Sequence, residues 1–229
     1  GNRIYAVLRG VGSGSDGRSK SVYAPVSEGQ ARALGRAYDH AGYSPRTVEL
    51  LEAHGTGTKA GDVAEFNGLR LVFEDEEHAE DRQWCAIGSV KSQIGHTKAA
   101  AGGAGLFKAV MGLHQKVLPP TLKVERLNPK LDIEDSPFYV NTSSRPWVRG
   151  SDHPRRASVS AFGFGGSNFH LTLEEYIGEE RAERLRGLPC EFISLSAEDA
   201  VSLASLAREF AARADGDATL QRLAWESHR

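Results

Sequence analysis

The chain is poor in cysteine: its 229 residues include only two, Cys85 and Cys190. Two cysteines in a chain of this size do not make the disulfide framework that small secreted domains use. We therefore expect a reducing, cytoplasmic location. The metal-binding spacings C-x-x-C and H-x-x-x-H are also missing, and no carboxylate near His54 or His96 stands at a familiar ligand spacing. The sequence thus predicts no metal site.

Long apolar runs and a large net charge are missing as well. No apolar run approaches the roughly 20 residues that cross a bilayer, and residues 1–5 do not resemble a signal peptide. The formal net charge of −2 provides no basic field for nucleic acid. We therefore expect neither a membrane nor a nucleic acid as partner. With 40% hydrophobic and 25% charged residues, the composition is that of a globular protein.

The pattern of apolar residues predicts alternating strands and helices. Short apolar runs predict strands at residues 4–11, 48–53, 85–90, 157–162 and 168–173. Helical patterns follow the first three strands: one of about 15 residues capped by Ser27, one opened by Asp62, and one from about Lys98 to His114. This order indicates a layered α/β fold with a mostly parallel sheet, closed by the two final antiparallel strands.

A second, smaller unit is predicted at the C-terminal end. The composition changes beyond Tyr176, so we divide the chain into domains at 1–176 and 177–229. A strand at 192–196 and a helix from about Glu198 to Ala214 make this unit a small α/β linker. At the other end, a strand at 4–11 starts very near the first residue, which suggests that the chain is a fragment of a longer protein.

Two groups of glycines call for an interpretation. Residues Gly12–Gly17 match G-x-G-x-x-G after a strand, which is the fingerprint of a dinucleotide site. The context is wrong, because no helix opens there and Pro25 would stop one, so we expect a flexible loop instead. Gly102, Gly103 and Gly105 lie inside a predicted helix, where each costs about 1 kcal/mol relative to alanine. Their presence predicts close backbone packing of that helix.

Two histidines are candidates for chemistry, because each follows a predicted parallel strand. His54 ends the strand at 48–53, and His96 follows the strand at 85–90, five residues after Lys91. The carboxyl ends of such strands meet at one edge of a sheet, where sites gather. A helix begins near His96, and a helix N-terminus disfavours added positive charge. Two neutral imidazoles at one point could stabilise a carbonyl oxygen that becomes an enolate.

A third motif is the glycine-rich turn between the last two strands. Gly163, Phe164 and Gly165 place exposed backbone N–H groups in a tight turn, which suits an oxyanion hole. An aromatic residue is unusual in a turn, so we predict that Phe164 walls or gates a pocket. Taken alone, each of these motifs also has an ordinary structural interpretation, as a loop histidine, a surface lysine or a plugged turn.

In this order and at these intervals, the motifs resemble the β-ketoacyl synthase (ketosynthase) family. They are residues 52–58, residues 90–96 followed by 99–102, and residues 162–168. The resemblance covers about residues 1–176, the C-terminal half of such a domain. Residues 177–229 resemble the linker that leads from a ketosynthase toward an acyltransferase in polyketide synthases. Residues 91–97 and 118–122 look most like iterative polyketide or polyunsaturated fatty acid synthases.

The resemblance implies a thiolase-like fold, usually dimeric, and a decarboxylative Claisen condensation in chain elongation. It implies no cofactor, since the substrates arrive on the phosphopantetheine of an acyl carrier protein. His54 and His96 would promote decarboxylation, with Lys91 supporting His96 electrostatically. Phe164 would gate the pocket and, with Gly163 and Gly165, form the acyl oxyanion hole. Thr56, Thr58 and Asn168 are further candidates for the substrate pocket.

The sequence departs from the family in one serious respect, the missing nucleophile. The family's cysteine lies in the N-terminal half, on a strand-to-helix elbow. Cys85 is inside a strand and Cys190 is in the linker, so neither has that context. We therefore expect the chain alone to be inactive and to need the N-terminal half as partner. Two alternatives stay open: a non-catalytic partner or scaffold module, and a thiolase-like acyltransferase without decarboxylation. The histidine pair argues against the latter, because such relatives replace the first histidine.

Overall fold

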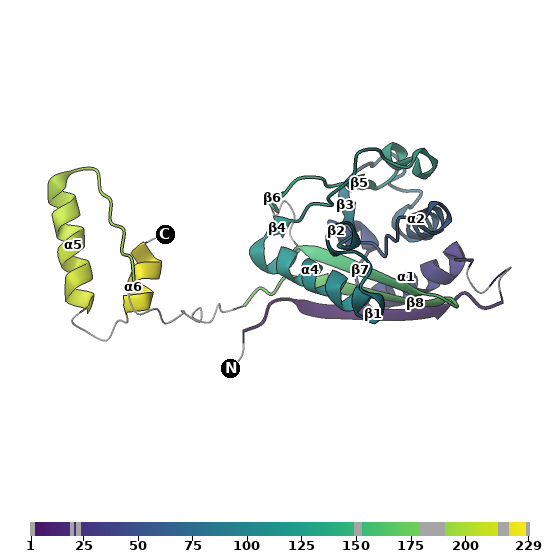
Figure 1. The fold of residues 1–229 in the computed structure, drawn as a ribbon, viewed down its shortest axis with the longest axis horizontal. Coiled ribbons are helices and arrows are strands. Elements are labelled where there is room, and N and C mark those ends of the chain that lie inside the picture. The colour runs from purple at the N-terminus through teal and green to yellow at the C-terminus, as the bar shows by residue number, and fades with distance from the viewer. Residues whose placement is uncertain are drawn as a thin grey trace. The chain divides into compact units, whose positions relative to one another are not determined.

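The structure, a computed structural model, describes residues 3–18, 21, 24–148, 153–178, 191–214 and 220–227. They divide into two compact units, Gly1–Gly178 and Glu179–Arg229. Each unit is described by itself below (Figure 1).

The first unit is built on a six-stranded sheet of mostly parallel strands. β2 pairs in parallel with β3 and β7, and β3 pairs in parallel with β5, whereas β8 is antiparallel to β7 and β1. This arrangement confirms the predicted parallel sheet with closing antiparallel strands. In spatial order the strands are β1 (Val7–Ser15), β8 (Ser167–Glu174), β7 (Arg156–Gly163), β2 (Leu50–Glu52), β3 (Cys85–Gly88) and β5 (Phe138–Val140).

Helices cover both faces of the sheet, which gives three layers (Figure 1). Side chains alternate along each strand, so Leu51 packs with α1 and α2, whereas its neighbour Leu50 packs with α4. The helical segments are α1 (Ser27–Ala41), η1 (Pro45–Thr47), α2 (Lys59–Phe73), α3 (Lys91–Ile94), η2 (Lys98–Ala100), α4 (Ala101–Gln115), η3 (Pro129–Leu131) and η4 (Ile133–Asp135). A separate two-stranded sheet pairs β4 (Val117–Leu118) with β6 (Arg145–Pro146).

The first glycine group is part of a strand, so the predicted flexible loop was wrong. β1 extends to Ser15, and its alternate residues Gly10, Gly12 and Gly14 face α1. A Cβ on Gly12 would lie 1.9 Å from the carbonyl oxygen of Ala33. These glycines therefore let a helix approach a strand closely, which is one of the ordinary uses of glycine in a strand.

Two predicted helix starts need correction. Val26 occupies the N-cap of α1, and the Ser27 hydroxyl instead donates a 2.8 Å hydrogen bond to the carbonyl of Ala64 on α2. α2 starts three residues before Asp62, at Lys59, with Thr58 as its N-cap. In both cases the serine or acid lies inside the first turn, where such residues are also favoured.

Glycines also bring α4 close to the sheet. A Cβ on Gly102 would lie 3.2 Å from Ala161, and one on Gly105 would lie 3.0 Å from Glu52. The close packing predicted for this helix is thus confirmed at these two positions. At Gly103 a Cβ would meet nothing within 4 Å, so the prediction was wrong there.

In the described residues of the second unit, the regular elements are helices. α5 (Ala200–Ala214) and α6 (Leu220–Ser227) are joined by an ion pair between Arg213 and Glu226. The strand predicted at 192–196 is not formed, because residues 191–197 have no regular hydrogen-bonded structure. No helix in the described ranges is long and apolar enough to cross a membrane.

Candidate functional site

The structure brings His54 and His96 together at the ends of adjacent parallel strands. His54 lies two residues after β2, and His96 follows β3 and the short helix α3. Their ring centroids are 5.7 Å apart, with the ring planes nearly perpendicular at 86°. The ring of Phe162 on β7 lies 5.8 Å from that of His54 and forms an apolar wall beside it. Sequence reasoning therefore placed the two imidazoles correctly at one point.

His54 is held by its backbone, and its ring is kept uncharged. Its N–H donates a 2.7 Å hydrogen bond to Oε1 of Glu65, and the N–H of Gly55 donates to Oε2 at 2.8 Å. Burial, followed by the charges of Lys91 and His96, lowers the pKa of His54 to about 4. The imidazole is therefore neutral at physiological pH. Its Nδ1 is buried and has no hydrogen-bond partner among the described residues.

The tautomer of His96 follows from one backbone contact. The N–H of Lys98 donates a 3.0 Å hydrogen bond to Nδ1 of His96. An imidazole nitrogen that accepts a hydrogen bond carries no proton, so in this geometry the proton of the neutral ring is on Nε2. His96 is exposed and directly precedes the turn that leads into α4. Its Nε2–H group is therefore a donor available to a substrate oxygen.

Lys91 is half-buried beside the pair, at the start of α3. Burial lowers the pKa of its ammonium group, while the carboxylates of Glu52 and Glu65 act in the opposite direction. Its charge helps to keep His54 neutral. The next residues anchor α3 to the neighbouring segment: Gln93 Nε2 donates to the carbonyl of Pro120 at 2.7 Å.

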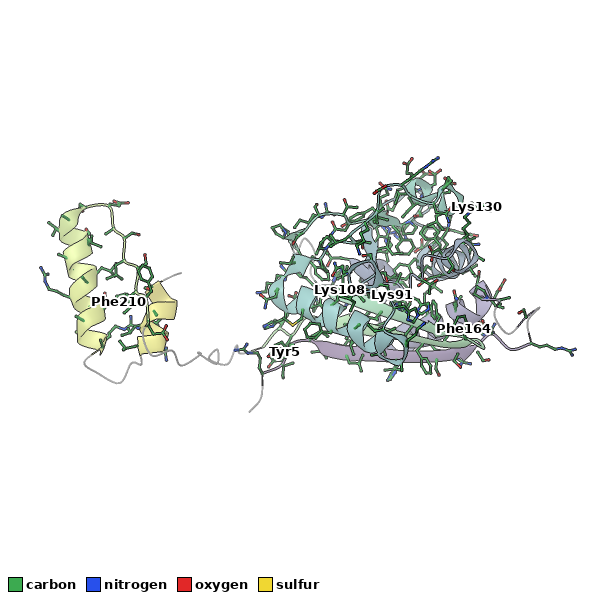
Figure 2. All side chains as sticks on the ribbon, in the orientation of Figure 1. Tyr5, Lys91, Lys108, Lys130, Phe164 and Phe210 are labelled. Atoms are coloured by element: carbon green, nitrogen blue, oxygen red, sulfur yellow. The ribbon has the colours of Figure 1, made fainter. Side chains whose placement is uncertain are left out.

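The glycine-rich turn forms the tip of the β7–β8 hairpin, beyond the end of β2. Gly165 and Gly166 have φ values of 83° and 77°, a conformation that favours glycine. Phe164 is 87% exposed at this tip (Figure 2). The turn is fixed to β1, because the N–H of Asp16 donates a 2.9 Å hydrogen bond to the carbonyl of Gly166.

Comparisons with known proteins show the family of the chain. Residues 5–125 match the family "Beta-ketoacyl synthase, C-terminal domain", and residues 128–228 match "Ketoacyl-synthetase C-terminal extension". The chain belongs to the β-ketoacyl synthase family. Its second unit therefore lies within the range of the extension, which also includes η3, η4 and the strands from β5 to β8 of the first unit.

Two curated β-ketoacyl synthase relatives show how much of a larger protein the chain represents. It is 45% identical over 212 residues to a polyunsaturated fatty acid synthase of Thraustochytrium sp., matching 91% of this chain and 8% of that protein. It is 43% identical over 184 residues to the polyketide synthase PksL of Bacillus subtilis, matching 80% of this chain and 4% of that protein. The chain thus spans less than a tenth of either relative.

Solved ketosynthase structures show the same fold. The ketosynthase from module 6 of the bacillaene synthase of B. subtilis 168 superposes with a TM-score of 0.72 at 37% identity, covering 98% of this chain and 38% of that one. Ketosynthase twelve of the bacillaene synthase of B. amyloliquefaciens gives 0.73 at 36% identity, covering 97% and 38%. The fold is therefore the thiolase-like fold of ketosynthases, of which the chain supplies less than half.

Within this ketosynthase fold, the predicted pocket residues differ in what they contact. Thr56 and Thr58 are exposed after His54, and Thr58 caps α2 by accepting a hydrogen bond from Gly61 at 3.1 Å. Asn168 is 1% exposed, and its amide donates to Asp16 at 2.6 Å and to the carbonyl of Gly166. These contacts join Asn168 to Asp16 and to the glycine-rich turn, and its assignment to the substrate pocket stays a prediction.

Sequence reasoning missed two buried carboxylates below the histidines. Glu65 on α2 holds the His54 loop, and burial raises the pKa of its carboxyl to about 7. Glu52 ends β2 and forms a buried ion pair with Lys108 on α4 at 2.9 Å. Glu52 could have been noticed, because an acid at the end of an apolar strand needs a partner. The position of Glu65 on its helix carried no such signal.

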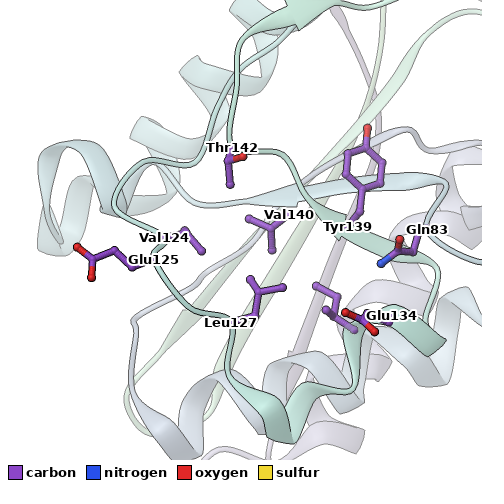
Figure 3. Close-up of a pocket in the computed structure, with 9 residues that line it drawn as sticks. Gln83, Val124, Glu125, Leu127, Glu134, Tyr139, Val140 and Thr142 are labelled. Atoms are coloured by element: carbon purple, nitrogen blue, oxygen red, sulfur yellow. The ribbon is translucent and has the colours of Figure 1, made fainter.

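A pocket away from the histidines is lined by other residues. It has a volume of about 450 Å³ and is lined by residues of β5 and of the segment 124–134, including Leu127, Glu134 and Tyr139 (Figure 3). None of the predicted site residues lines it. We assign the site to the histidine pair, because the polar groups that could do chemistry converge there.

Among the described residues, the one cysteine, Cys85, contributes no nucleophile to the site. Cys85 is fully buried in β3, and burial raises the pKa of its thiol well above the ordinary value. Cys190 lies outside the described residues. Within the described ranges, no group of three or more histidine, cysteine or acidic side chains could hold a metal ion.

Proposed function

We propose that this chain supplies the decarboxylating half of a β-ketoacyl synthase active site, and that a cysteine from the N-terminal half supplies the rest. The observation that carries the proposal is the histidine pair, two imidazoles at 5.7 Å, one with a lowered pKa and one with a free Nε2–H. Such a pair can donate hydrogen bonds to one oxygen without carrying positive charge. This is the requirement for stabilising an enolate in a water-poor site.

The proposed reaction is a decarboxylative Claisen condensation in polyketide or fatty acid elongation. The C–C bond between the malonyl carboxylate and the methylene carbon breaks, CO₂ leaves, and the electron pair forms the enolate of the thioester. His54 and His96 donate hydrogen bonds to the enolate oxygen. The enolate carbon then attacks the acyl-cysteine, whose C–S bond breaks, and the released thiolate takes up a proton. Backbone N–H groups of the turn at Gly163, Phe164 and Gly165 would stabilise the oxyanion of that second step.

The proposal implies a defined set of partners. Both substrates would arrive on the phosphopantetheine of an acyl carrier protein, without a cofactor bound to this chain. The complete domain would form a homodimer in the cytoplasm, and residues 177–229 would link it toward an acyltransferase. Support for this placement comes from the family matches and from the polyketide and polyunsaturated fatty acid synthases among the relatives.

Complementation tests the proposal directly. The chain is co-expressed with the N-terminal half of the ketosynthase domain from the same coding region, and release of CO₂ from malonyl carrier protein is measured. We expect decarboxylation and condensation from the pair, and neither from the chain alone. A complex that forms but has no activity would instead support the non-catalytic scaffold alternative. Acylation of Cys85 or Cys190 in the isolated chain, detected by mass spectrometry, would also contradict the proposal.

The two histidines can be separated from the nucleophile by substitution. In the complemented domain, His54→Ala should abolish malonyl decarboxylation, because one of two enolate donors is lost, whereas acyl loading of the cysteine should continue. A loss of about 100-fold to 1,000-fold is typical when one such donor is removed. Equal loss of acyl loading would show that His54 acts elsewhere in the reaction.

A further inference from the structure

Glu52 is a buried carboxylate for which the proposed chemistry has no direct use. It is the last residue of β2, two positions before His54, and it is 2% exposed. Its Oε1 accepts a 2.5 Å hydrogen bond from the backbone N–H of Val90. Its Oε2 forms the 2.9 Å ion pair with Lys108, whose side chain is 8% exposed. One carboxylate therefore joins the end of β2, the residue before Lys91, and helix α4.

The contact with Val90 lies where backbone pairing between β2 and β3 ends. The paired register stops at Glu52 and Gly88, and one further backbone hydrogen bond of 2.8 Å runs from Ala53 to Gly88. From there one segment continues to His54 and the other to Lys91 and His96. The Glu52 side chain adds a connection between these segments beyond the last backbone bond. It thereby fixes the start of α3 relative to the end of β2.

Lys108 ties the same carboxylate to α4, the helix that follows His96 (Figure 2). A glycine makes room for the Glu52 side chain. A Cβ on Gly105 would lie 3.0 Å from Cγ of Glu52. The space between α4 and the sheet is thus shaped to admit an ion pair where apolar side chains would otherwise pack.

Stability alone does not account for such a pair. Removing two charges from water costs about as much as their attraction returns, so an apolar pair of similar volume is often equally stable or more so. What an ion pair with a third hydrogen bond adds is fixed geometry. Here that geometry joins the segments that carry His54, Lys91 and His96, and a misplacement of about 1 Å at such a site can cost roughly 100-fold in rate.

We infer that Glu52 is a positioning residue that holds the His54 and His96 segments at the separation needed for decarboxylation. Glu52 acts through the N–H of Val90, and Lys108 compensates the buried charge of Glu52. The catalytic meaning of this inference rests on the proposed function. The fixed geometry of the histidine pair, however, is a property of the folded chain and can be measured without turnover.

Two double variants isolate the hydrogen bond to Val90. One variant combines Glu52→Gln with Lys108→Met, and the other combines Glu52→Leu with Lys108→Met. Both remove the ion pair and leave positions 52 and 108 uncharged. Glutamine keeps a carbonyl oxygen that can accept from the Val90 N–H, whereas leucine has none. The two proteins therefore differ at position 52 in the side-chain amide, whose carbonyl oxygen is the acceptor for Val90, and comparing them cancels the effect of the lost charges.

The first measurement is the NMR titration of His54 in the chain itself. The low pKa of about 4 depends on burial and on the neighbouring Lys91 and His96. We expect it to stay low in the glutamine variant and to rise by about one unit or more in the leucine variant, as the two segments separate. The second measurement is decarboxylation by the complemented domain, where the leucine variant should lose about 100-fold in kcat relative to the glutamine variant, with KM and acyl loading unchanged.

The inference is overturned if the folded leucine variant keeps both the low titration of His54 and the kcat of the glutamine variant. If the leucine variant does not fold, Glu52→Asp replaces it, since the shorter carboxylate cannot reach both Val90 and Lys108. An undiminished kcat in Glu52→Asp would overturn the inference as well. If the complemented wild-type domain releases no CO₂, the proposed function fails, and the His54 titration alone decides for or against positioning.

Discussion

Glu65 lies below the His54 loop with both carboxylate oxygens engaged by backbone N–H groups. Because burial raises the pKa of its carboxyl from 4.5 to about 7, the folded chain binds more protons there than the unfolded chain between these two pH values. Its contribution to stability therefore decreases as the pH rises through this window. The loop that carries His54 is thus sensitive to pH through a residue that does not touch substrate.

Glu65→Gln should remove this pH dependence. Relative to the variant, the wild type should lose about 3 kcal/mol of unfolding free energy between pH 4.5 and pH 8, because the ionised carboxylate is disfavoured by burial. Urea unfolding at both pH values measures the difference. Glu28→Gln, at an exposed position on α1, is the control and should behave as the wild type. If the unfolding free energies of the wild type and Glu65→Gln differ by the same amount at both pH values, Glu65 is not the source of the pH dependence.

His170 should produce the opposite pH dependence. It is fully buried, with its ring nitrogens near Ser160 at 3.0 Å and Tyr38 at 3.3 Å, and burial lowers its pKa from 6.5 to about 3. The unfolded chain binds more protons here, so the stability contributed by neutral His170 is complete above pH 6.5 and is lost as the pH falls toward 3.

When the pH falls from 7.5 to 4.5, the wild type should therefore lose about 2–3 kcal/mol more unfolding free energy than His170→Gln. Chemical denaturation at the two pH values checks this. The exposed histidine His40 on α1 provides the control, since His40→Gln should keep the wild-type loss. If His170→Gln loses as much unfolding free energy as the wild type between these pH values, another group causes the acid sensitivity.

At this scale, sequence reasoning found the residues whose signal is local. His54, His96 and the glycine turn stand in short motifs next to strand ends, and the structure places the two histidines together. Glu52 and Glu65 were missed because their meaning depends on partners elsewhere in the chain: Val90 lies 38 residues from Glu52, and His54 lies 11 residues from Glu65. The contact of Asn168 with Asp16 was missed for the same reason, because Asp16 is 152 residues away.

At the scale of elements, the contact between β1 and α1 is unusually close, because alternate residues of β1 are glycines. The layer of side chains that normally separates a helix from a strand is reduced here to alanine and glycine. Ala33 and Ala37 of α1 face Gly12 directly, and both are fully buried. The position of α1 against β1 thus depends on the glycines of β1 having no side chains.

Gly12→Ala should lower the free energy of unfolding by about 1–3 kcal/mol or more, the usual effect of overpacking. Its Cβ would lie 1.9 Å from a backbone oxygen, which cannot move as a flexible side chain can. Gly35→Ala on α1 is the matched control, because a Cβ there meets nothing within 4 Å, and it should stabilise the helix by up to about 1 kcal/mol. Thermal unfolding measures both, and equal effects of the two substitutions would contradict the close contact.

The elements that were predicted well have a clear hydrophobic period or a boundary marked by turn residues. The hairpin of β7 and β8 around its glycine turn was predicted nearly to the residue. β5 was missed because three residues within a proline-rich stretch show no period. The strand predicted at 192–196 had the right composition, but a strand also needs a neighbour to pair with, and no such pairing is found in the described part of the second unit.

At the scale of the whole molecule, α4 buries only one of its faces. Ala101, Ala109 and Leu113 pack toward the sheet, whereas Phe107 is 69% exposed. The chain covers about 38% of the length of the solved ketosynthases to which it is similar. We expect the exposed face of α4 to contact the remainder of the domain, because burying an exposed aromatic ring against another surface is favourable.

Phe107→Asp should therefore leave the fold of the isolated chain intact but weaken its association with the N-terminal half by at least about tenfold, since a charge would be buried without a partner. Sedimentation analysis of the mixed halves measures the affinity. Val201→Asp is the matched control, because Val201 is 81% exposed on α5 and should not change the affinity. Equal affinities for the two variants would place the interface on another face.

The pairing of β1 with β8 joins the beginning of the described chain to the end of the first unit, since Val7 lies opposite Glu174. During synthesis, β1 leaves the ribosome long before β8 exists. Its unpaired edge must wait until some 160 residues more have been made, and contacts of such sequence separation form slowly. Until then the strand is an open edge of the kind that promotes aggregation. The yield of folded protein therefore depends on the order in which the strands are synthesised as well as on how they pack.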